Sequence, residues 1–286
     1  MTTNSALYSG RIGLSRFCAA TTAIFLILFS LCFGSWWAVG RSAGAEGVAT
    51  SLIANTQVRT GVAEKLIEQF TSDADAQVKA VVDAKRDQLV EVVANALASP
   101  EISSETKRII DQVYGFYTGE SNSADVDIKA LVTPILKSMA SVDPAFDVSD
   151  IDTSDIPPIQ LDDSGNAPNL APVKSGLAIA VFAFFALLVL SIVGLAKYSR
   201  NKNSFVGVIG WEFTAIGAFL LAVFFVATAS VKSAAQSATD PLVNSAAPVV
   251  AQTFLSMFKV EGILLLLVGL IGVFTWARTR QARPAQ

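Results

Sequence analysis

The stretch FCAATTAIFLILFSLCFGSWWAV, residues 17–39, is apolar over its whole length. Three further runs have the same character, at residues 176–196, 205–231 and 260–277. Each is long enough for an α-helix to cross the ~30 Å hydrocarbon core of a bilayer, which takes roughly 17 to 25 residues. Backbone groups in lipid must be hydrogen-bonded within the protein, and no run alternates apolar and polar residues as barrel strands do. The sequence therefore predicts four transmembrane helices.

Composition supports this class and excludes much chemistry. The chain is 52% hydrophobic, only 16% charged, and contains no histidine. Catalytic triads that use histidine, histidine-ligated zinc and histidine proton relays are therefore excluded. Both cysteines, Cys18 and Cys32, lie in the first run, so no disulfide can form within the polar segments. Phosphate-binding, dinucleotide-binding and hydrolase motifs are absent, and we expect no enzyme, no cofactor and no metal site.

Positive charge is distributed unevenly along the chain. Eight of the 21 Lys and Arg residues flank the apolar runs on one side, with no Asp or Glu among them: Arg11, Arg16, Lys197, Arg200, Lys202, Arg278, Arg280 and Arg283. Nearly all 24 carboxylates lie on the other side. Because short basic loops stay in the cytoplasm, we expect a plasma-membrane protein with both termini cytoplasmic and residues 40–174 extracytoplasmic. The basic residues are too few and dispersed for nucleic-acid binding, and we expect them to contact anionic lipid.

These observations predict the following order along the chain: a cytoplasmic N-terminus (1–16), transmembrane helix 1 (17–39), an extracytoplasmic helical domain (40–140), an acidic Pro-containing linker (141–174), transmembrane helix 2 (175–197), a cytoplasmic loop (198–204), transmembrane helix 3 (205–231), an extracytoplasmic hairpin (232–259), transmembrane helix 4 (260–277) and a cytoplasmic C-terminus (278–286). A cleaved signal peptide is the alternative for the first run, because Ala43-Gly44-Ala45 imitates a cleavage site. The length of the run and the interfacial residues Trp36 and Trp37 favour a retained span.

Helical periodicity dominates residues 40–140. Four amphipathic helices are expected, over 48–70, from after Asp73 to 97, over 104–117 and over 125–139. Leu66 lies on the apolar stripe of the first helix and is expected to be buried. Ser99-Pro100 ends the second helix, because proline disfavours helix at the preceding residue. The predicted fold class is all-α, with four transmembrane helices plus an extracytoplasmic helical bundle domain between spans one and two.

The acidic linker offers one candidate ion site. Calcium could gather around its aspartates, Asp147, Asp150, Asp152 and Asp155, or around the sequence Asp162-Asp163-Ser164-Gly165-Asn166. The EF-hand spacing, which ends on a glutamate at the twelfth position, is absent. A solvated acidic linker is therefore the favoured interpretation.

Glu212 is the candidate functional residue inside the membrane, because an intramembrane carboxylate is unfavourable and usually serves a function. It could carry a proton or pair with a cation. The alternative is a structural role, in which its side chain extends toward the cytoplasmic edge of the membrane or pairs with a nearby basic residue: Arg16, Lys197, Arg200 or Lys202. Glu261, beside Lys259, is interpreted as an interfacial residue. Glycines in the last two runs predict close packing of these spans.

Two short motifs carry a resemblance. They are LIANTQVR at residues 52–59, with the pattern L-x-x-N-x-x-V-R, and Val126-Asp127-Ile128. With the four-span layout, the chain resembles uncharacterised actinobacterial four-span integral membrane proteins that have a helical extracytoplasmic domain after the first span. The resemblance implies this layout and brings no catalytic residues.

Three functions are compatible with the sequence. The favoured one is a non-enzymatic scaffold or accessory subunit whose extracytoplasmic domain contacts a membrane or envelope protein. The alternatives are a transporter or channel component that uses Glu212, and a membrane sensor. The expected interaction partners are the lipid bilayer and a membrane or envelope protein. Self-association into a homo-oligomer is also compatible with the sequence.

Overall fold

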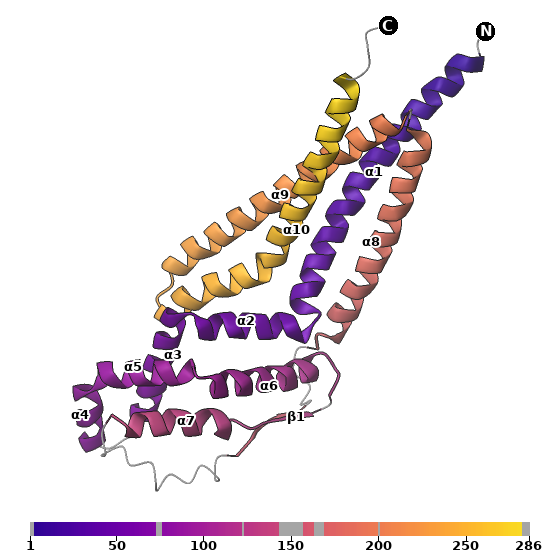
Figure 1. Cartoon of the computed structure of the whole chain (residues 1–286). Coiled ribbons are helices and arrows are strands. Elements are labelled where there is room, and N and C mark those ends of the chain that lie inside the picture. The colour runs from indigo at the N-terminus through magenta and orange to yellow at the C-terminus, as the bar shows by residue number, and fades with distance from the viewer. Residues whose placement is uncertain are drawn as a thin grey trace. The chain divides into compact units, whose positions relative to one another are not determined.

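The computed structural model describes residues 3–72, 76–121, 123–142, 157–162, 169–199 and 201–281, and most of these are helical (Figure 1). The chain divides into two compact units. The first, here called the membrane unit, comprises Met1–Gly40, Val173–Thr228 and Leu255–Gln286. The second, here called the polar unit, comprises Arg41–Pro172 and Ala229–Phe254.

Four long helices contain the four apolar runs. They are α1 (Thr3–Val39), α8 (Ala171–Tyr198), α9 (Lys202–Gln236) and α10 (Pro241–Gln281). All four are long and apolar enough to cross a membrane, and in α1 the suitable stretch is Gly13–Val39. The structure thus confirms the helical character and the four candidate spans of a multi-pass membrane protein.

Helices α1 and α8 pack antiparallel through aromatic and hydroxyl side chains. The Thr22 hydroxyl of α1 donates a hydrogen bond of 3.1 Å to Ser191 Oγ of α8. The rings of Phe29 and Phe185 lie 5.8 Å apart between their centroids. Both hydroxyls are buried and also bond to carbonyls of their own helices. Interhelical hydrogen bonds of this kind stabilise membrane helix pairs by about 0.6 kcal/mol on average.

The apolar centre of the membrane unit is built by all four helices. The cluster comprises Leu26, Leu188, Ile216, Leu220 and Phe258. Other apolar side chains point away from it, and on α8 Ile179, Phe182 and Leu190 are 67–74% exposed. A water-soluble protein rarely leaves so wide an apolar surface uncovered, whereas lipid tails solvate it well.

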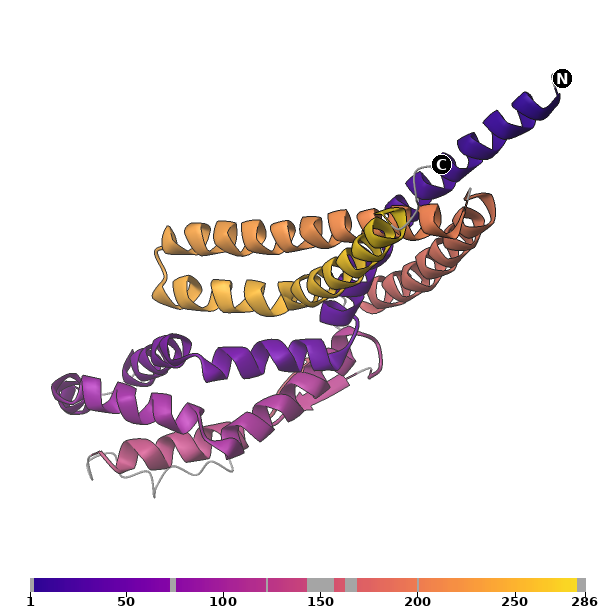
Figure 2. The ribbon, with the colours of Figure 1, turned by 45° about the horizontal axis from the view of Figure 1, so that its top comes forward.

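Helices α9 and α10, orange and yellow in Figure 2, follow one another in the ribbon. Glycines bring their backbones into contact. A Cβ atom on Gly217 would lie 2.5 Å from the Leu266 nitrogen, and one on Gly210 would lie 2.7 Å from the Val273 nitrogen. From the other side, a Cβ atom on Gly262 would lie 3.0 Å from the Gly217 carbonyl oxygen. The predicted close packing of the last two spans is therefore confirmed, and it requires glycine because no side chain fits between the backbones.

The polar unit contains six shorter helices and two strands among the described residues. The helices are α2 (Ser42–Ala54), α3 (Thr56–Ser72), α4 (Ala76–Ala84), α5 (Arg86–Leu97), α6 (Pro100–Tyr117) and α7 (Lys129–Ala140). The strands are β1 (Ser123–Val126) and β2 (Ile159–Asp162). Helix α2 packs on α6, α3 packs on α5, and α5 packs on α7.

The predicted helix over 48–70 is in fact two helices that meet at a corner. Asn55 has an extended backbone, with φ −81° and ψ 117°, and it ends α2. Its side-chain Oδ1 accepts a hydrogen bond of 3.1 Å from the Val58 nitrogen, which is how asparagine caps the start of a helix. Arg59 donates hydrogen bonds to the carbonyls of Ile53 and Ala54 at the end of α2. The L-x-x-N-x-x-V-R motif therefore encodes this corner.

One apolar core holds α3, α4, α5 and α7 together. Its buried members are Ala63, Ile67, Val82, Leu89, Val93, Ala94 and Met139. The expected burial of Leu66 is wrong: Leu66 is 37% exposed, whereas Ile67 is 1% exposed. Within α3 the buried residues are Val58, Gly61, Ala63 and Ile67, so Leu66 lies at the margin of the buried face.

Capping residues set the ends of α6. The Ser99 hydroxyl accepts a hydrogen bond from the Ile102 nitrogen, and Pro100 occupies the first helical position. The helix therefore begins at Pro100 and not at the expected position 104. It ends at Gly119, whose φ of +72° suits glycine, and the Glu120 nitrogen donates to the Gly115 carbonyl. This is a Schellman motif.

The largely helical structure is consistent with the all-α prediction, and the polar unit adds one small antiparallel sheet that was not predicted. Strand β1 pairs with β2, with Ala124 opposite Leu161 and Val126 opposite Ile159. Helix α7 consequently begins at Lys129 and not at position 125. Part of the predicted linker thus has a fixed structure, and near its end the Leu170 nitrogen donates to the Tyr117 carbonyl. The aspartates proposed as calcium ligands between 147 and 155, and residues 163–166, lie outside the described residues.

The segment expected to be a separate hairpin, 232–259, belongs mostly to α9 and α10. Only residues 237–240 separate these two helices. Asp240 caps α10 by accepting a 2.8 Å hydrogen bond at Oδ1 from the Leu242 nitrogen. A Cβ atom on Gly61 of α3 would lie 3.4 Å from Leu242 Cδ1, so this end of α10 packs on α3 within the polar unit.

Candidate functional site within the membrane helices

Glu212 of α9 lies at a groove in the membrane unit. The groove has a volume of about 320 Å³ and is lined by Ser204, Gly207, Val208, Trp211, Glu212 and Trp276. It forms where α9 and α10 meet, since a Cβ atom on Gly207 would lie 2.6 Å from the Trp276 ring. One carboxylate oxygen of Glu212, Oε2, is buried without a hydrogen-bond partner among the described residues.

One structural alternative for Glu212, an ion pair with a nearby basic residue, is not formed within the described part of the chain. Lys197 instead has its Nζ 5.9 Å from the centroid of the Tyr198 ring. The guanidinium carbons of Arg278 and Arg280 lie 4.5 Å and 5.3 Å from the ring centroids of Phe274 and Trp276. Arg200, another candidate partner, lies outside the described residues. These cation–aromatic pairs are typical of a membrane interface, where amphipathic rings and basic side chains gather.

Glu261 of α10 is a second enclosed carboxylate. Both of its carboxylate oxygens are buried and have no partner with hydrogen-bond geometry among the described residues. The Ser30 side chain of α1, which is 2% exposed, lies beside the carboxyl group. Lys259 does not pair with it, because its Nζ lies 5.7 Å from the centroid of the Phe224 ring. The structure adds to the interfacial interpretation of Glu261 that its carboxylate is enclosed by the protein and does not pair with Lys259.

Helical periodicity in the sequence could have indicated that Glu261 lies close to the buried face of its helix. Phe258, Gly262 and Gly269 form the buried side of α10, and Glu261 lies three residues after the first of them. The neighbours Val260 and Leu264 are 48% and 57% exposed. Proximity to Lys259 suggested an interfacial pair, but the ring of Phe224 engages that lysine.

The two carboxylates lie on the two helices joined by glycines. Glu212 follows Gly210, which faces Gly272, and Glu261 precedes Gly262, which faces Gly217. The two glycine contacts are seven residues apart along α9, or ~10 Å at 1.5 Å per residue. In the described part of the membrane unit, a carboxylate with a buried oxygen that lacks a hydrogen bond thus lies near each of these two glycine contacts, and the contact of Gly269 with the Thr214 backbone lies between them.

Among the described residues of the membrane unit, one other buried side-chain atom, Ser199 Oγ, has no hydrogen-bond partner, and it is uncharged. Thr214, next to Glu212 in the same helix, donates a 2.8 Å hydrogen bond to the Gly210 carbonyl. Thr22 and Ser191 bond to one another. An unpaired acceptor in an apolar surrounding is unfavourable by several kcal/mol when it is charged. Glu212 and Glu261 are therefore the ionisable groups with buried oxygens that lack a hydrogen bond in the described part of this unit.

The polar unit has a groove of its own, with a volume of about 440 Å³. It lies between α3 and the start of α10 and is lined by Thr56, Gln57, Thr60, Gly61, Glu64, Pro241, Asn244 and Ser245. Hydroxyl and amide groups dominate this lining. In the residues that the structure describes, no group of three or more His, Cys, Asp and Glu side chains could hold a metal ion.

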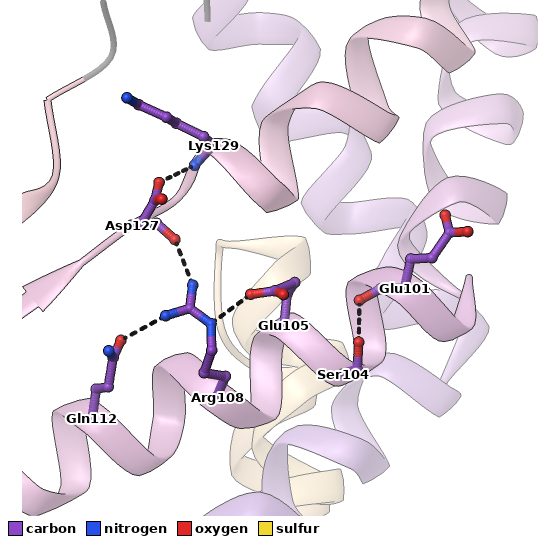
Figure 3. Close-up of polar contacts among 7 residues, drawn as sticks. All are labelled: Glu101, Ser104, Glu105, Arg108, Gln112, Asp127 and Lys129. Carbon is purple, nitrogen blue, oxygen red and sulfur yellow. Dashed lines mark hydrogen bonds and ion pairs between the residues drawn. The ribbon is translucent and has the colours of Figure 1, made fainter. Parts of the chain in front are cut away.

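Arg108 connects α6 to the start of α7 in the same unit (Figure 3). Its Nε donates to Glu105 Oε2 at 2.7 Å, and its Nη2 donates to the Asp127 carbonyl at 3.3 Å. The Asp127 carboxylate accepts a 2.9 Å hydrogen bond from the Lys129 nitrogen, which begins α7. The side chains of Arg108 and Glu105 are 42% and 30% exposed, so solvent screens this pair and its role is structural.

Comparison with protein-family models, with curated proteins and with solved structures finds no match to this chain.

Proposed function

We propose that the protein is a non-enzymatic membrane scaffold or accessory subunit that binds a protein partner through its polar unit. In this proposal the chain lies in the plasma membrane with both termini in the cytoplasm. Residues 40–174 and the ends of α9 and α10 then face outward. The basic residues that flank one end of the apolar runs support this orientation.

A pair of exposed apolar side chains on α3 carries the proposal. Leu66 and Phe70 are 37% and 39% exposed, and their spacing of four places them on one face of the helix. The core contacts of α3 are made by other residues, Ala63 and Ile67, which are 0% and 1% exposed. Leu66 and Phe70 are therefore not needed for the unit's own core and are available for a partner.

A crosslinking experiment in intact cells tests this role. A photoreactive amino acid at position 70 should form a discrete protein adduct, and one at Glu68, on another face of α3, should not. The double variant Leu66→Ser, Phe70→Ser should no longer co-purify with the partner protein that was identified by crosslinking. The amount of folded chain should stay unchanged. Adducts of equal yield at both positions, or a partner retained by the double variant, would contradict the proposal.

A transporter or channel component is the second candidate. The observation that favours it is that Glu212 of α9 and Glu261 of α10 have buried carboxylate oxygens without a hydrogen-bond partner among the described residues. An ionisable residue without a partner inside the membrane is often part of an ion or proton pathway. Replacing Glu212 distinguishes the two functions, as argued below.

A further inference from the structure

We propose that Glu261 of α10 and Ser30 of α1 form a binding site for a small cation, either a proton or Na⁺, enclosed by the membrane helices. This site does not depend on the partner-binding role of the polar unit. A chain that only scaffolds could carry it as a structural ion site, and a transporter could use it in turnover.

The geometry places the two groups at a contact between α1 and α10. Ser30 lies beside the Glu261 carboxyl group. One helical turn away, a Cβ atom on Gly34 of α1 would lie 2.7 Å from the Phe258 ring of α10. The small Gly34 lets the two helices approach, and this brings the buried hydroxyl of Ser30 next to the carboxylate.

A carboxylate at this position requires a positive charge. Both oxygens of Glu261 are enclosed and have no hydrogen-bond partner among the described residues. An ionised carboxylate without a partner in an apolar surrounding is highly unfavourable. A bound proton removes the charge, and a bound Na⁺ compensates it through oxygen ligands, which hard cations prefer.

The charged groups of the neighbouring helices do not supply that compensation. Lys259 of α10 lies over the Phe224 ring of α9. On α9, Glu212 is also a carboxylate, so it adds negative charge. On α8, Lys174 is 11 residues from Phe185, the residue that faces Phe29, and this is ~16 Å along the helix.

Cys32 and the basic residues at the other end of the helices also leave the Glu261 carboxylate uncompensated. Cys32 is the titratable side chain of α1 closest in sequence to Ser30, and a separation of two residues places it on a different face of the helix. The basic residues of the membrane unit at the other end of the helices, such as Lys197 and Arg278, lie beside aromatic rings. A cation from solution is therefore the occupant that the site fits.

Carbodiimide labelling of the full-length protein in lipid vesicles tests the site. Dicyclohexylcarbodiimide dissolves in lipid and reacts with protonated carboxyl groups, and the modified peptides are identified by mass spectrometry. With choline as the only added cation, Glu261 should be modified many times faster than Glu68, an exposed carboxylate of α3. Glu261→Gln should lose the modified peptide, which verifies the assignment.

The occupant is distinguished by adding Na⁺ at constant ionic strength. Labelling of Glu261 should slow severalfold if Na⁺ binds there, and should be unchanged if the site holds only a proton. Ser30→Ala should alter the labelling rate of Glu261, whereas Thr21→Val should not, because the Thr21 hydroxyl bonds only to carbonyls of its own helix. Labelling of Glu261 no faster than that of Glu68, or a rate indifferent to Ser30→Ala, would overturn the proposal.

Discussion

Arg59 donates a hydrogen bond of 2.6 Å from Nη1 to the carbonyl of Ile53, six residues earlier in the chain. The same nitrogen also donates to the Ala54 carbonyl at 3.0 Å. These carbonyls end α2, where the helix leaves acceptors without partners and its dipole favours positive charge. Arg59, in the first turn of α3, therefore couples the end of one helix to the start of the next.

Replacing Arg59 should loosen this corner. Arg59→Ala removes both hydrogen bonds, and we expect the free energy of unfolding to fall by about 1–3 kcal/mol. The measurement is thermal unfolding of the full chain in detergent, followed by circular dichroism. Lys65→Ala is the matched control, since Lys65 forms only a 3.8 Å pair with Glu68 and both side chains are exposed. Equal melting temperatures for the two variants would show that the corner contributes nothing to stability.

The effect of a charged substitution on the stability of the polar unit should depend on whether the replaced apolar residue of α3 is buried or exposed. Ile67→Asp places a carboxylate where the side chain is 1% exposed, so the unit should fail to fold. Leu66→Asp, at the neighbouring exposed position, should change stability by less than ~0.5 kcal/mol. Limited proteolysis of both variants in membranes distinguishes them. Similar protease sensitivity of the two variants would be inconsistent with the register of α3 described above.

The glycine contact should be intolerant of side chains. A Cβ atom on Gly217 would lie 2.5 Å from the Leu266 nitrogen, so Gly217→Val should separate α9 from α10 and lower the melting temperature in detergent. Ala218→Val is the control, because Ala218 is exposed beside it in the same helix. An equally small effect of both changes would mean that the two backbones are not in contact.

Topology is tested by cysteine labelling, in a chain from which Cys18 and Cys32 have been replaced by alanine. A cysteine at Ser121 should react with a membrane-impermeant maleimide in intact cells. Cysteines at Ser5 and Ser199 should react only after the membrane is permeabilised. This expectation follows from the basic residues near Ser5 and Ser199. Labelling of Ser199 but not Ser121 would invert the proposed orientation.

Glu212→Gln separates the two candidate functions. If the carboxylate is structural, the amide keeps its shape, and both the protein level and partner crosslinking at position 70 should be unchanged. If Glu212 carries protons or cations, a pH- or ion-dependent phenotype should be lost at a normal protein level. We expect the first outcome. Glu68→Gln, an exposed change in the polar unit, controls for the loss of one negative charge.

The membrane helices were predictable because lipid imposes one simple requirement. A segment of about 20 apolar residues has few alternatives to a helix in a bilayer, so the four runs determine α1, α8, α9 and α10. The packing of α9 on α10 was also foreseen from its glycines. The ends of these helices were less predictable, since α10 begins at Pro241, 19 residues before its apolar run.

The structure of the polar unit and of the candidate site could not be predicted from local periodicity alone. The corner at Asn55 arises from one side chain that caps α3, and a continuous apolar stripe conceals it. The pairing of β1 with β2 joins residues more than 30 positions apart. The enclosure of Glu261 could not be predicted from local sequence, because its surroundings include Ser30 of α1, a distant residue that only the tertiary structure brings close.

The backbone contact between α9 and α10 also has an entropic consequence. Glycine has no rotamers to lose, so the closest contacts of this helix pair form without the loss of side-chain freedom that accompanies an interface of longer side chains. Helix α1 meets α8 instead through rings such as Phe29 and Phe185, which must be ordered. The glycine contacts of α9 with α10 therefore lose less side-chain conformational entropy on packing than the aromatic contacts of α1 with α8.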